Sequence, residues 1–406
     1  MIFNNPIVSE EEKWIFNCFL FPLIEMFLFF AVSTYLLLAK IPITAFNFIA
    51  CYLLGLAYLF FSDRKNFVKS LALSTLILTV PMIFCNFIWD YSWDGNAYHK
   101  LSVGLLKNGW NPIYQTIYEA ISDAGVFAEG TANAAFYDGY PKASYIIGAC
   151  IYAFTGKIEA GKAYNLFAMI SAFGIVYFVC KNTLSLKKIQ SGIIAFVLCC
   201  NTVTASQAIT YYNDGLLQSL VFIVCAVLFY LYKTDERKIS LVHFIIAISI
   251  IIGVNLKYSA MLLFFLPCLV YLIYILLKRK ESILFTISFY AMIVFAALIV
   301  FGLTSYVHNI LFYHNPLYTL LGDGKEDILT PQIPLAYRKT SNIMRIIYSI
   351  FAPYDNNQDL QNIVLKVPLT FSLEEIKTTV LSCDTRTGGW GIFYSFLFII
   401  TIISFV

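Results

Sequence analysis

Residues 14–38 read WIFNCFLFPLIEMFLFFAVSTYLLL, an apolar block in which Glu25 is the only charged side chain. A helix needs about 20 apolar residues to cross a bilayer, and in lipid a helix satisfies its own backbone hydrogen bonds. This block is therefore predicted to be a transmembrane helix. Glu25 is expected either to pair with another helix or to extend toward the lipid headgroups.

Similar blocks recur along the chain, in which 60% of the 406 residues are hydrophobic and 13% are charged. Soluble domains average about 25% charged residues. The predicted spans are 14–38, 42–62, 69–89, 163–180, 189–205, 215–232, 240–256, 259–277, 283–307 and a last one that starts near 391. We therefore expect an all-α polytopic membrane protein of about ten transmembrane helices, forming one domain over 1–406.

Charge and cysteine usage exclude several classes of partner and site. The net charge is only +3, which implies no nucleic-acid partner. All the cysteines except Cys383 lie in apolar blocks, where a free thiol behaves as a small hydrophobe. The sequence therefore predicts neither a disulfide framework nor a metal site, although a divalent ion remains compatible with it.

Four short basic segments predict the orientation, because loops rich in Lys and Arg face the cytoplasm. They are 64–69, 181–188, 233–238 and 278–280. If the short apolar stretch 143–156 crossed the membrane, the last three would lie outside. We therefore expect 143–156 to lie in the interface, or to dip into the membrane and return. The N-terminus is then cytoplasmic, in the plasma (inner) membrane.

Two long polar segments, 90–142 and 308–390, then share the extracytoplasmic face. Loops longer than about 15 residues are unusual unless they are functional. The chemistry is therefore expected at this extracytoplasmic mouth, with short interfacial helices.

The first of these segments opens with a candidate carboxylate. Residues 89–100 read WDYSWDGNAYHK, and a short helical pattern follows to Lys107. Asp94 suits an N-cap, Gly109 a C′ position and Pro112 a stop. Asp94 either only caps this helix or faces a cavity as a functional group, since ionisable residues at a membrane boundary are functional candidates. Asp90, four residues earlier, is the alternative.

Five further polar clusters lie on the same predicted face: 137–142, 211–215, 255–258, 314–318 and 384–391. Each has a structural interpretation as well as a functional one. Asp214 is placed to cap a helix, and Lys142 and Lys257 are long enough to reach headgroups. His314, which precedes Asn-Pro, suits a turn. The gathering of carboxylates and cations on one face of a charge-poor protein favours function.

In this order, these motifs resemble the GT-C superfamily of membrane glycosyltransferases, and especially protein O-mannosyltransferases and lipid A aminoarabinose transferases. The matching elements are Asp94–His99, the Gly-Trp-Asn-Pro turn at 109–112, Tyr140-Pro141-Lys142, Tyr211–Asp214 and the Gly-Gly-Trp-Gly of 388–391. Two features depart from the family pattern. Gly95 follows Asp94 where the family commonly has a second carboxylate, and two extra spans precede the first loop.

The resemblance implies inverting transfer of a sugar from a polyprenyl-phosphate donor to a hydroxyl of a glycan, lipid or protein acceptor. Asp94 would be the general base, with Asp90 as its substitute. Cations would stabilise the lipid-phosphate leaving group. The residues assigned to substrate binding are Tyr98, His99, Lys142, Asp214, Lys257, His314 and Arg386.

Two other functions remain open. A surface-polysaccharide polymerase or ligase would use the same lipid-linked substrates, with Arg338, Arg345 and His314 essential. A lipid-linked sugar flippase or transporter would need polar or broken helices near the bilayer midplane, whereas the predicted spans are nearly free of charge.

Overall fold

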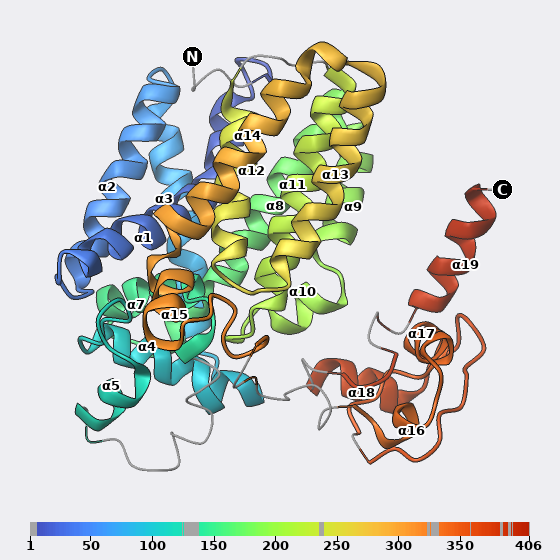
Figure 1. The fold of residues 1–406 in the computed structure, drawn as a ribbon. Coiled ribbons are helices and arrows are strands. Elements are labelled where there is room, and N and C mark those ends of the chain that lie inside the picture. Colours follow the sequence, from blue (N-terminus) through green and yellow to red (C-terminus); the bar gives the residue numbers. More distant parts are fainter. Residues whose placement is uncertain are drawn as a thin grey trace.

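The computed structural model describes residues 6–123, 125, 138–234, 239–322, 325, 333–357, 359–381, 385–388, 391 and 393–405. Over these residues the chain is helical, and its only β-type pairing is an isolated bridge between Asp355 and Thr387. Most helices form an upright bundle, and the elements from α16 (Leu335–Arg338) onward lie to one side of it (Figure 1). The predicted all-α class is confirmed.

Seven helices in the described part are long and apolar enough to cross a membrane. They are α1 (Lys13–Leu38), α2 (Ala45–Ser62), α3 (Phe67–Asn86), η3 with α8 (Ile158–Ala163, Tyr164–Thr183), α11 (Asp214–Thr234), α13 (Ala260–Lys278) and α14 with η5 (Ile283–Phe295, Ala296–Val300). Three further predicted spans are shorter apolar helices, α9 (Lys188–Cys199), α12 (Leu241–Val254) and α19 (Tyr394–Phe405). The chain therefore has the architecture of an integral membrane protein.

The predicted span 189–205 is interrupted by Asn201. The side chain of Asn201 accepts hydrogen bonds from the backbone N–H groups of Val203 and Thr204, at 3.0 and 3.3 Å. Asn is among the strongest N-cap residues, so α9 ends here and a separate short helix, α10 (Thr202–Gln207), begins.

The basic loops gather at one end of the bundle. Three contacts bring the ends of α8, α11 and α13 together beside the N-terminal segment: Lys181–Glu12, Tyr230–Pro6 and Arg279–Tyr232. The α2–α3 loop with Arg64 lies at the same end, because Cys18 near the start of α1 bonds the Ser70 carbonyl near the start of α3. We call this the basic end. The opposite end, where α1 and α3 finish, is the mouth.

Helix α7 (Ala143–Thr155) starts and finishes at the mouth, as predicted for 143–156. At its start, the Ala143 N–H donates to the Asn255 carbonyl at 2.7 Å, just beyond α12. After its end, Lys162 bonds the Ile88 carbonyl just beyond α3. Gly156, at φ +67°, supplies the left-handed residue that commonly ends a helix. The helix is buried over most of its length against α1, α2 and α4 (Lys100–Lys107).

Close packing within the bundle depends on small residues. A Cβ atom at Gly174 of α8 would overlap the side chain of Phe19 on α1. At Gly55 of α2, a Cβ would overlap Glu25 Oε1 and the ring of Phe21. Glu25 is fully buried there, and neither of its carboxyl oxygens has a hydrogen-bond partner in the described residues. It therefore neither pairs with another helix nor reaches the headgroups, the two arrangements expected from the sequence.

The α1–α8 contact provides a direct test of this packing. We expect Gly174→Ala to lower the free energy of unfolding by about 1–3 kcal/mol, because an overpacked core must shift backbone or side chains. The control is Gly192→Ala on α9, where an added Cβ meets no atom within 4 Å. Thermal unfolding of the detergent-solubilised protein measures both variants. Equal melting temperatures for the two would contradict the proposed α1–α8 contact.

Candidate functional site

Asp90 connects the first loop at the mouth to the rest of the bundle. Its Oδ1 accepts hydrogen bonds from the Ser92 N–H and hydroxyl, at 2.8 and 2.6 Å, and its Oδ2 accepts from the Tyr211 N–H at 2.8 Å. The side chain is fully buried. Both oxygens thus hold backbone in place, which makes Asp90 a structural carboxylate in this arrangement.

The helix predicted to follow Asp94 is present, but its first turn is wide. Residues Gly95–His99 form a π-helical turn, η1, and α4 continues from it to Lys107. Gly109 adopts φ +106°, as expected for a residue just past a helix end. Such π-helical turns are frequent at functional sites. Here the turn places Tyr98 and His99 next to each other, with ring centroids 4.4 Å apart.

Asp94 occupies the N-cap position without acting as a cap. Its backbone is helical, at φ −60° and ψ −38°, and its side chain makes no capping hydrogen bond. Instead Oδ2 accepts a hydrogen bond from the Tyr98 hydroxyl at 2.8 Å. Burial raises the pKa of Tyr98, and the negative charge of Asp94 raises it further, so the phenol stays protonated and donates. The carboxylate is partly exposed and oriented by Tyr98.

The departure from the family pattern at Gly95 has a local cause. A Cβ atom at this position would overlap Asp90 Oδ2 and the Ser92 hydroxyl. The space that a second carboxylate would need is therefore already taken by the buried Asp90 side chain.

His99 is a buried imidazole beside Tyr98, the residue that bonds Asp94. Its Nδ1 lies 3.0 Å from the Tyr145 hydroxyl, and its ring centroid lies 6.3 Å from that of Tyr212. The pKa of His99 is lowered to about 3. Burial is the main cause, the positive charge of Lys257 adds to the shift, and the negative charge of Asp214 opposes it. His99 is therefore suited to hydrogen bonding and ring stacking rather than to carrying charge near neutral pH.

Asp214 and Lys257 complete the cluster. They form an ion pair at 2.5 Å, with side chains 40% and 45% exposed. Asp214 is the first residue of α11, and Lys257 follows α12. Because both charges act on His99, the structure brings together five of the nine predicted residues. We call Asp94, Tyr98, His99, Asp214 and Lys257 the mouth cluster.

Lys142 lies outside this cluster and is fully buried. Its ammonium donates to the carbonyls of Asp138 and Tyr140, at 2.6 and 3.0 Å. Burial lowers the pKa of Lys142 to about 8, although the Asp138 charge opposes this shift. The Lys142 ammonium is therefore directed into the protein, and not toward the lipid headgroups as expected.

Asp138, in the predicted polar cluster 137–142, belongs to a second buried group, whose link to His308 the sequence did not indicate. Its carboxylate accepts hydrogen bonds from the Ile117 N–H at 2.7 Å and from the Tyr313 hydroxyl. His308 Nε2 lies 3.5 Å from the same carboxylate, and His308 Nδ1 bonds the Pro112 carbonyl. Burial alone would raise the pKa of Asp138, but the contact with His308, the charge of Lys142 and the Tyr313 hydroxyl outweigh it, and the net shift is downward.

A third buried group lies beside Asp90. Glu159 forms ion pairs with Lys100, at 2.6 Å, and with Lys162. It also accepts a hydrogen bond from the Asp90 N–H at 3.1 Å. The sequence offered one sign of this group: Glu159 and Lys162 are three residues apart at the start of an apolar helix, a spacing that allows an ion pair.

The remaining predicted residues are not brought to the mouth cluster. His314 is exposed and ends α15 (Tyr306–Tyr313) at φ +54°, which agrees with its interpretation as a turn residue. Arg386 donates its N–H to the Asp355 carbonyl at 2.8 Å, in the segment after α15. Tyr137, Asp384, Gly389 and Trp390 lie outside the described residues.

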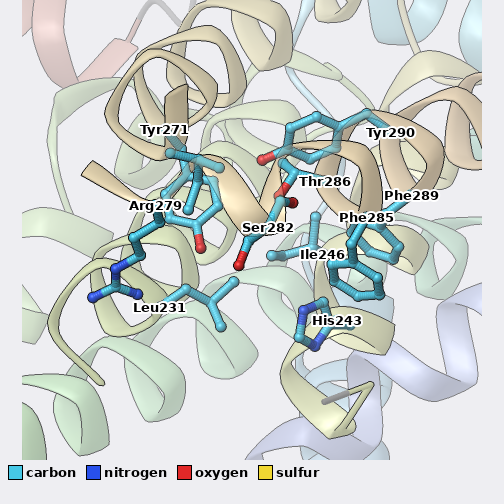
Figure 2. A pocket seen from close by; sticks show the side chains of 11 residues that line it. Leu231, His243, Ile246, Tyr271, Arg279, Ser282, Phe285, Thr286, Phe289 and Tyr290 are labelled. Atoms are coloured by element: carbon cyan, nitrogen blue, oxygen red, sulfur yellow. The ribbon is translucent and has the colours of Figure 1, made fainter. Parts of the chain in front are cut away.

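A small cavity lies between α11, α12, α13 and α14 at the basic end (Figure 2). It is lined by aromatic rings around His243, with Arg279 at its edge. Its volume of about 20 Å³ has room for roughly one water molecule and none for a sugar. This cavity is therefore no substrate site.

Within the described residues, no group of three or more His, Cys, Asp or Glu side chains is placed to hold a metal ion. No family model, curated protein or solved structure matches this chain. The family resemblance of the motifs therefore stays a prediction.

The buried His99 predicts a specific pH dependence. The pKa of a histidine is 6.5 in the unfolded chain and about 3 here. As the pH falls below 6.5, the unfolded chain gains a proton that folded His99 does not take up, so stability is lost. The expected loss is about 2 kcal/mol at pH 5.

We expect His99→Gln to remove this component and to flatten the decline in stability between pH 7 and pH 5. Thermal unfolding in detergent at both pH values, compared with the wild type, measures the difference. Parallel curves for wild type and variant would show that His99 is not held neutral.

Proposed function

We propose that this protein is a membrane glycosyltransferase of the GT-C type. It transfers a sugar, with inversion, from a polyprenyl-phosphate donor to a hydroxyl of a glycan, lipid or protein acceptor. The reaction takes place at the mouth, on the extracytoplasmic face of the plasma membrane. In this proposal about ten helices cross the bilayer, and the short helices at the mouth are interfacial.

One observation carries the proposal: the mouth cluster combines an oriented carboxylate with a cation at the end of the bundle opposite the basic loops. Asp94 is held by Tyr98 at 2.8 Å. Lys257, which pairs with Asp214 at 2.5 Å, lies close enough to His99 to lower the pKa of this imidazole. Glycosyl transfer from a lipid phosphate needs both a base for the acceptor and a positive charge for the leaving group.

Each member of the cluster has a distinct role in the mechanism. Asp94 accepts the proton of the acceptor hydroxyl as that oxygen attacks the anomeric carbon. Lys257 stabilises the negative charge that develops on the departing phosphate, and Asp214 positions the Lys257 ammonium. Tyr98 fixes the Asp94 rotamer. His99 and its neighbouring tyrosines are buried and support the cluster from within the protein.

Lys142 and Asp90 are assigned structural roles instead. The Lys142 ammonium is occupied by two backbone carbonyls, and both oxygens of Asp90 hold backbone N–H groups or Ser92. The cationic role expected for Lys142 passes to Lys257.

A flippase or transporter is the second candidate, because of Glu25. Buried ionisable residues within membrane spans commonly mark ion or substrate pathways. Glu25 is fully buried halfway along α1 and has no partner in the described residues. For a polymerase or ligase, the structure offers less support: Arg338 and Arg345 bond the nearby carbonyls of Ile333 and Tyr337.

The orientation of the chain is testable by thiol labelling in intact cells. A membrane-impermeant maleimide should react with a cysteine introduced at Asn357, in the second loop, and not with one introduced at Lys187, at the basic end. Labelling at Lys187 in sealed cells would reverse the proposed topology and move the mouth cluster to the cytoplasm.

The catalytic assignment is tested by Asp94→Asn. This change keeps the shape of the side chain and its ability to accept a hydrogen bond from Tyr98, but it removes the basicity. Loss of a general base typically costs about 10²–10⁴ in rate. Transfer of radiolabelled sugar from polyprenyl phosphate by purified protein should fall by this factor, with the melting temperature unchanged.

Asp90→Asn is the matched control, and it should have the opposite profile. The amide leaves the Tyr211 N–H without its acceptor in a buried site, which costs about 1–3 kcal/mol of stability. We expect a lower melting temperature, with residual turnover in the protein that remains folded. If Asp94→Asn retains wild-type turnover, the proposed mechanism is wrong.

A further inference from the structure

Helix α17 (Asn342–Phe351) presents an apolar face outward. Its sequence NIMRIIYSIF places Ile343, Ile346, Ile347 and Ile350 at the three- and four-residue spacing of one helix face. No residue of the helix is buried, and Ile343 and Ile346 are 72% and 61% exposed. A soluble surface helix normally turns such a face toward the core.

The polar side of α17 contacts the protein instead. Arg345 Nε donates to the Tyr337 carbonyl at 3.1 Å, and the ring of Tyr348 stacks on that of Tyr337 with centroids 5.7 Å apart. Tyr337 belongs to α16 (Leu335–Arg338). Helix α17 therefore turns its polar face toward the residues on which it packs and its apolar face away from them. The apolar face requires an apolar environment that these residues do not supply.

The apolar surface continues past the end of α17. The Lys366 N–H donates to the Phe351 carbonyl at 2.9 Å, which joins the segment 364–367 to the helix. Val364 and Val367 in this segment are 75% and 69% exposed. These valines add exposed apolar surface beside the end of α17, and we call the helix face and this segment together the apolar patch.

The patch lies against the point where an apolar helix begins. Phe351, at the end of α17, contacts Phe398 of α19, with ring centroids 6.4 Å apart. Helix α19 is predominantly apolar, carries no charged residue, and exposes Leu397 and Ile403. If α19 enters the bilayer, α17 lies at the depth of its first turns, which is the interface.

Charge at the start of α17 indicates the same environment. Arg338 and Lys339 are exposed just before the helix. Lys and Arg beside an amphipathic helix are attracted to anionic headgroups, while the apolar face of such a helix enters the boundary between headgroups and acyl chains.

We propose that α17, with the segment 364–367, is an interfacial docking surface for the lipid bilayer. Its isoleucine face enters the leaflet on the mouth side, and Arg338 and Lys339 lie among the headgroups. The described residues of α16, α17 and 359–381 are thereby held close to the membrane surface. This inference does not depend on glycosyl transfer.

The test is site-specific photo-crosslinking of the full chain in vesicles of phosphatidylcholine and phosphatidylglycerol. The photoreactive residue p-benzoylphenylalanine replaces Ile346 in one variant and Ile343 in a second. A third variant carries it at Lys377, an exposed polar position on α18 (Leu373–Leu381). Mass spectrometry after irradiation identifies what each position has captured.

We expect lipid adducts at Ile346 and Ile343, at a yield several-fold above that at Lys377. Adducts with a second copy of the chain, or with another segment of the same chain, without lipid adducts would overturn the proposal and identify the true occupant of the face. Equal lipid yields at all three positions would also overturn it, because the apolar face would then have no preference for lipid.

Discussion

The buried carboxylate of Asp90 is the interaction on which the mouth depends. Through its two oxygens and its backbone it bonds to Ser92, Tyr211 and Glu159, and its carbonyl accepts from Asn96 at 2.8 Å. These contacts join three chain segments that are far apart in the sequence. Burying an ionised carboxylate is costly unless it is hydrogen-bonded, and the bonds that satisfy Asp90 fix the positions of all three segments. The mouth cluster is carried by two of them, through Asp94 and Asp214.

The buried group around Asp138 likewise joins separate segments of the chain. Asp138, Lys142 and His308 hold together the end of the first loop and the helix after α14. The two groups show a structural use of the carboxylates at the mouth. Asp90 and Asp138 bond backbone groups of neighbouring segments, whereas Asp94 and Asp214 stay partly exposed.

This division could not be recognised from the sequence. Asp90 and Asp94 have similar neighbours and similar spacing, as do Lys142 and Lys257. Their roles separate through contacts that the apolar pattern does not show. The N–H of Tyr211, far away in the sequence, reaches Asp90, whereas the carbonyls of Asp138 and Tyr140, close to Lys142 in the sequence, bond its ammonium. The π-helical turn, which brings Tyr98 back to Asp94, also left no signal in the pattern of apolar residues.

The sequence by itself determined that the protein is all-helical, that it has long apolar spans, that its basic loops lie at one end and that 143–156 returns to the side where it began. Span length and loop charge decide these features. Both are local properties of the sequence: span length must match the thickness of the bilayer, and loop charge sets the orientation of the helices. Only the tertiary structure decided which ionisable groups are buried in complete hydrogen-bond networks, which remain exposed, and that α17 turns its apolar face outward. Those outcomes depend on hydrogen bonds and packing between distant segments, and no local pattern encodes them.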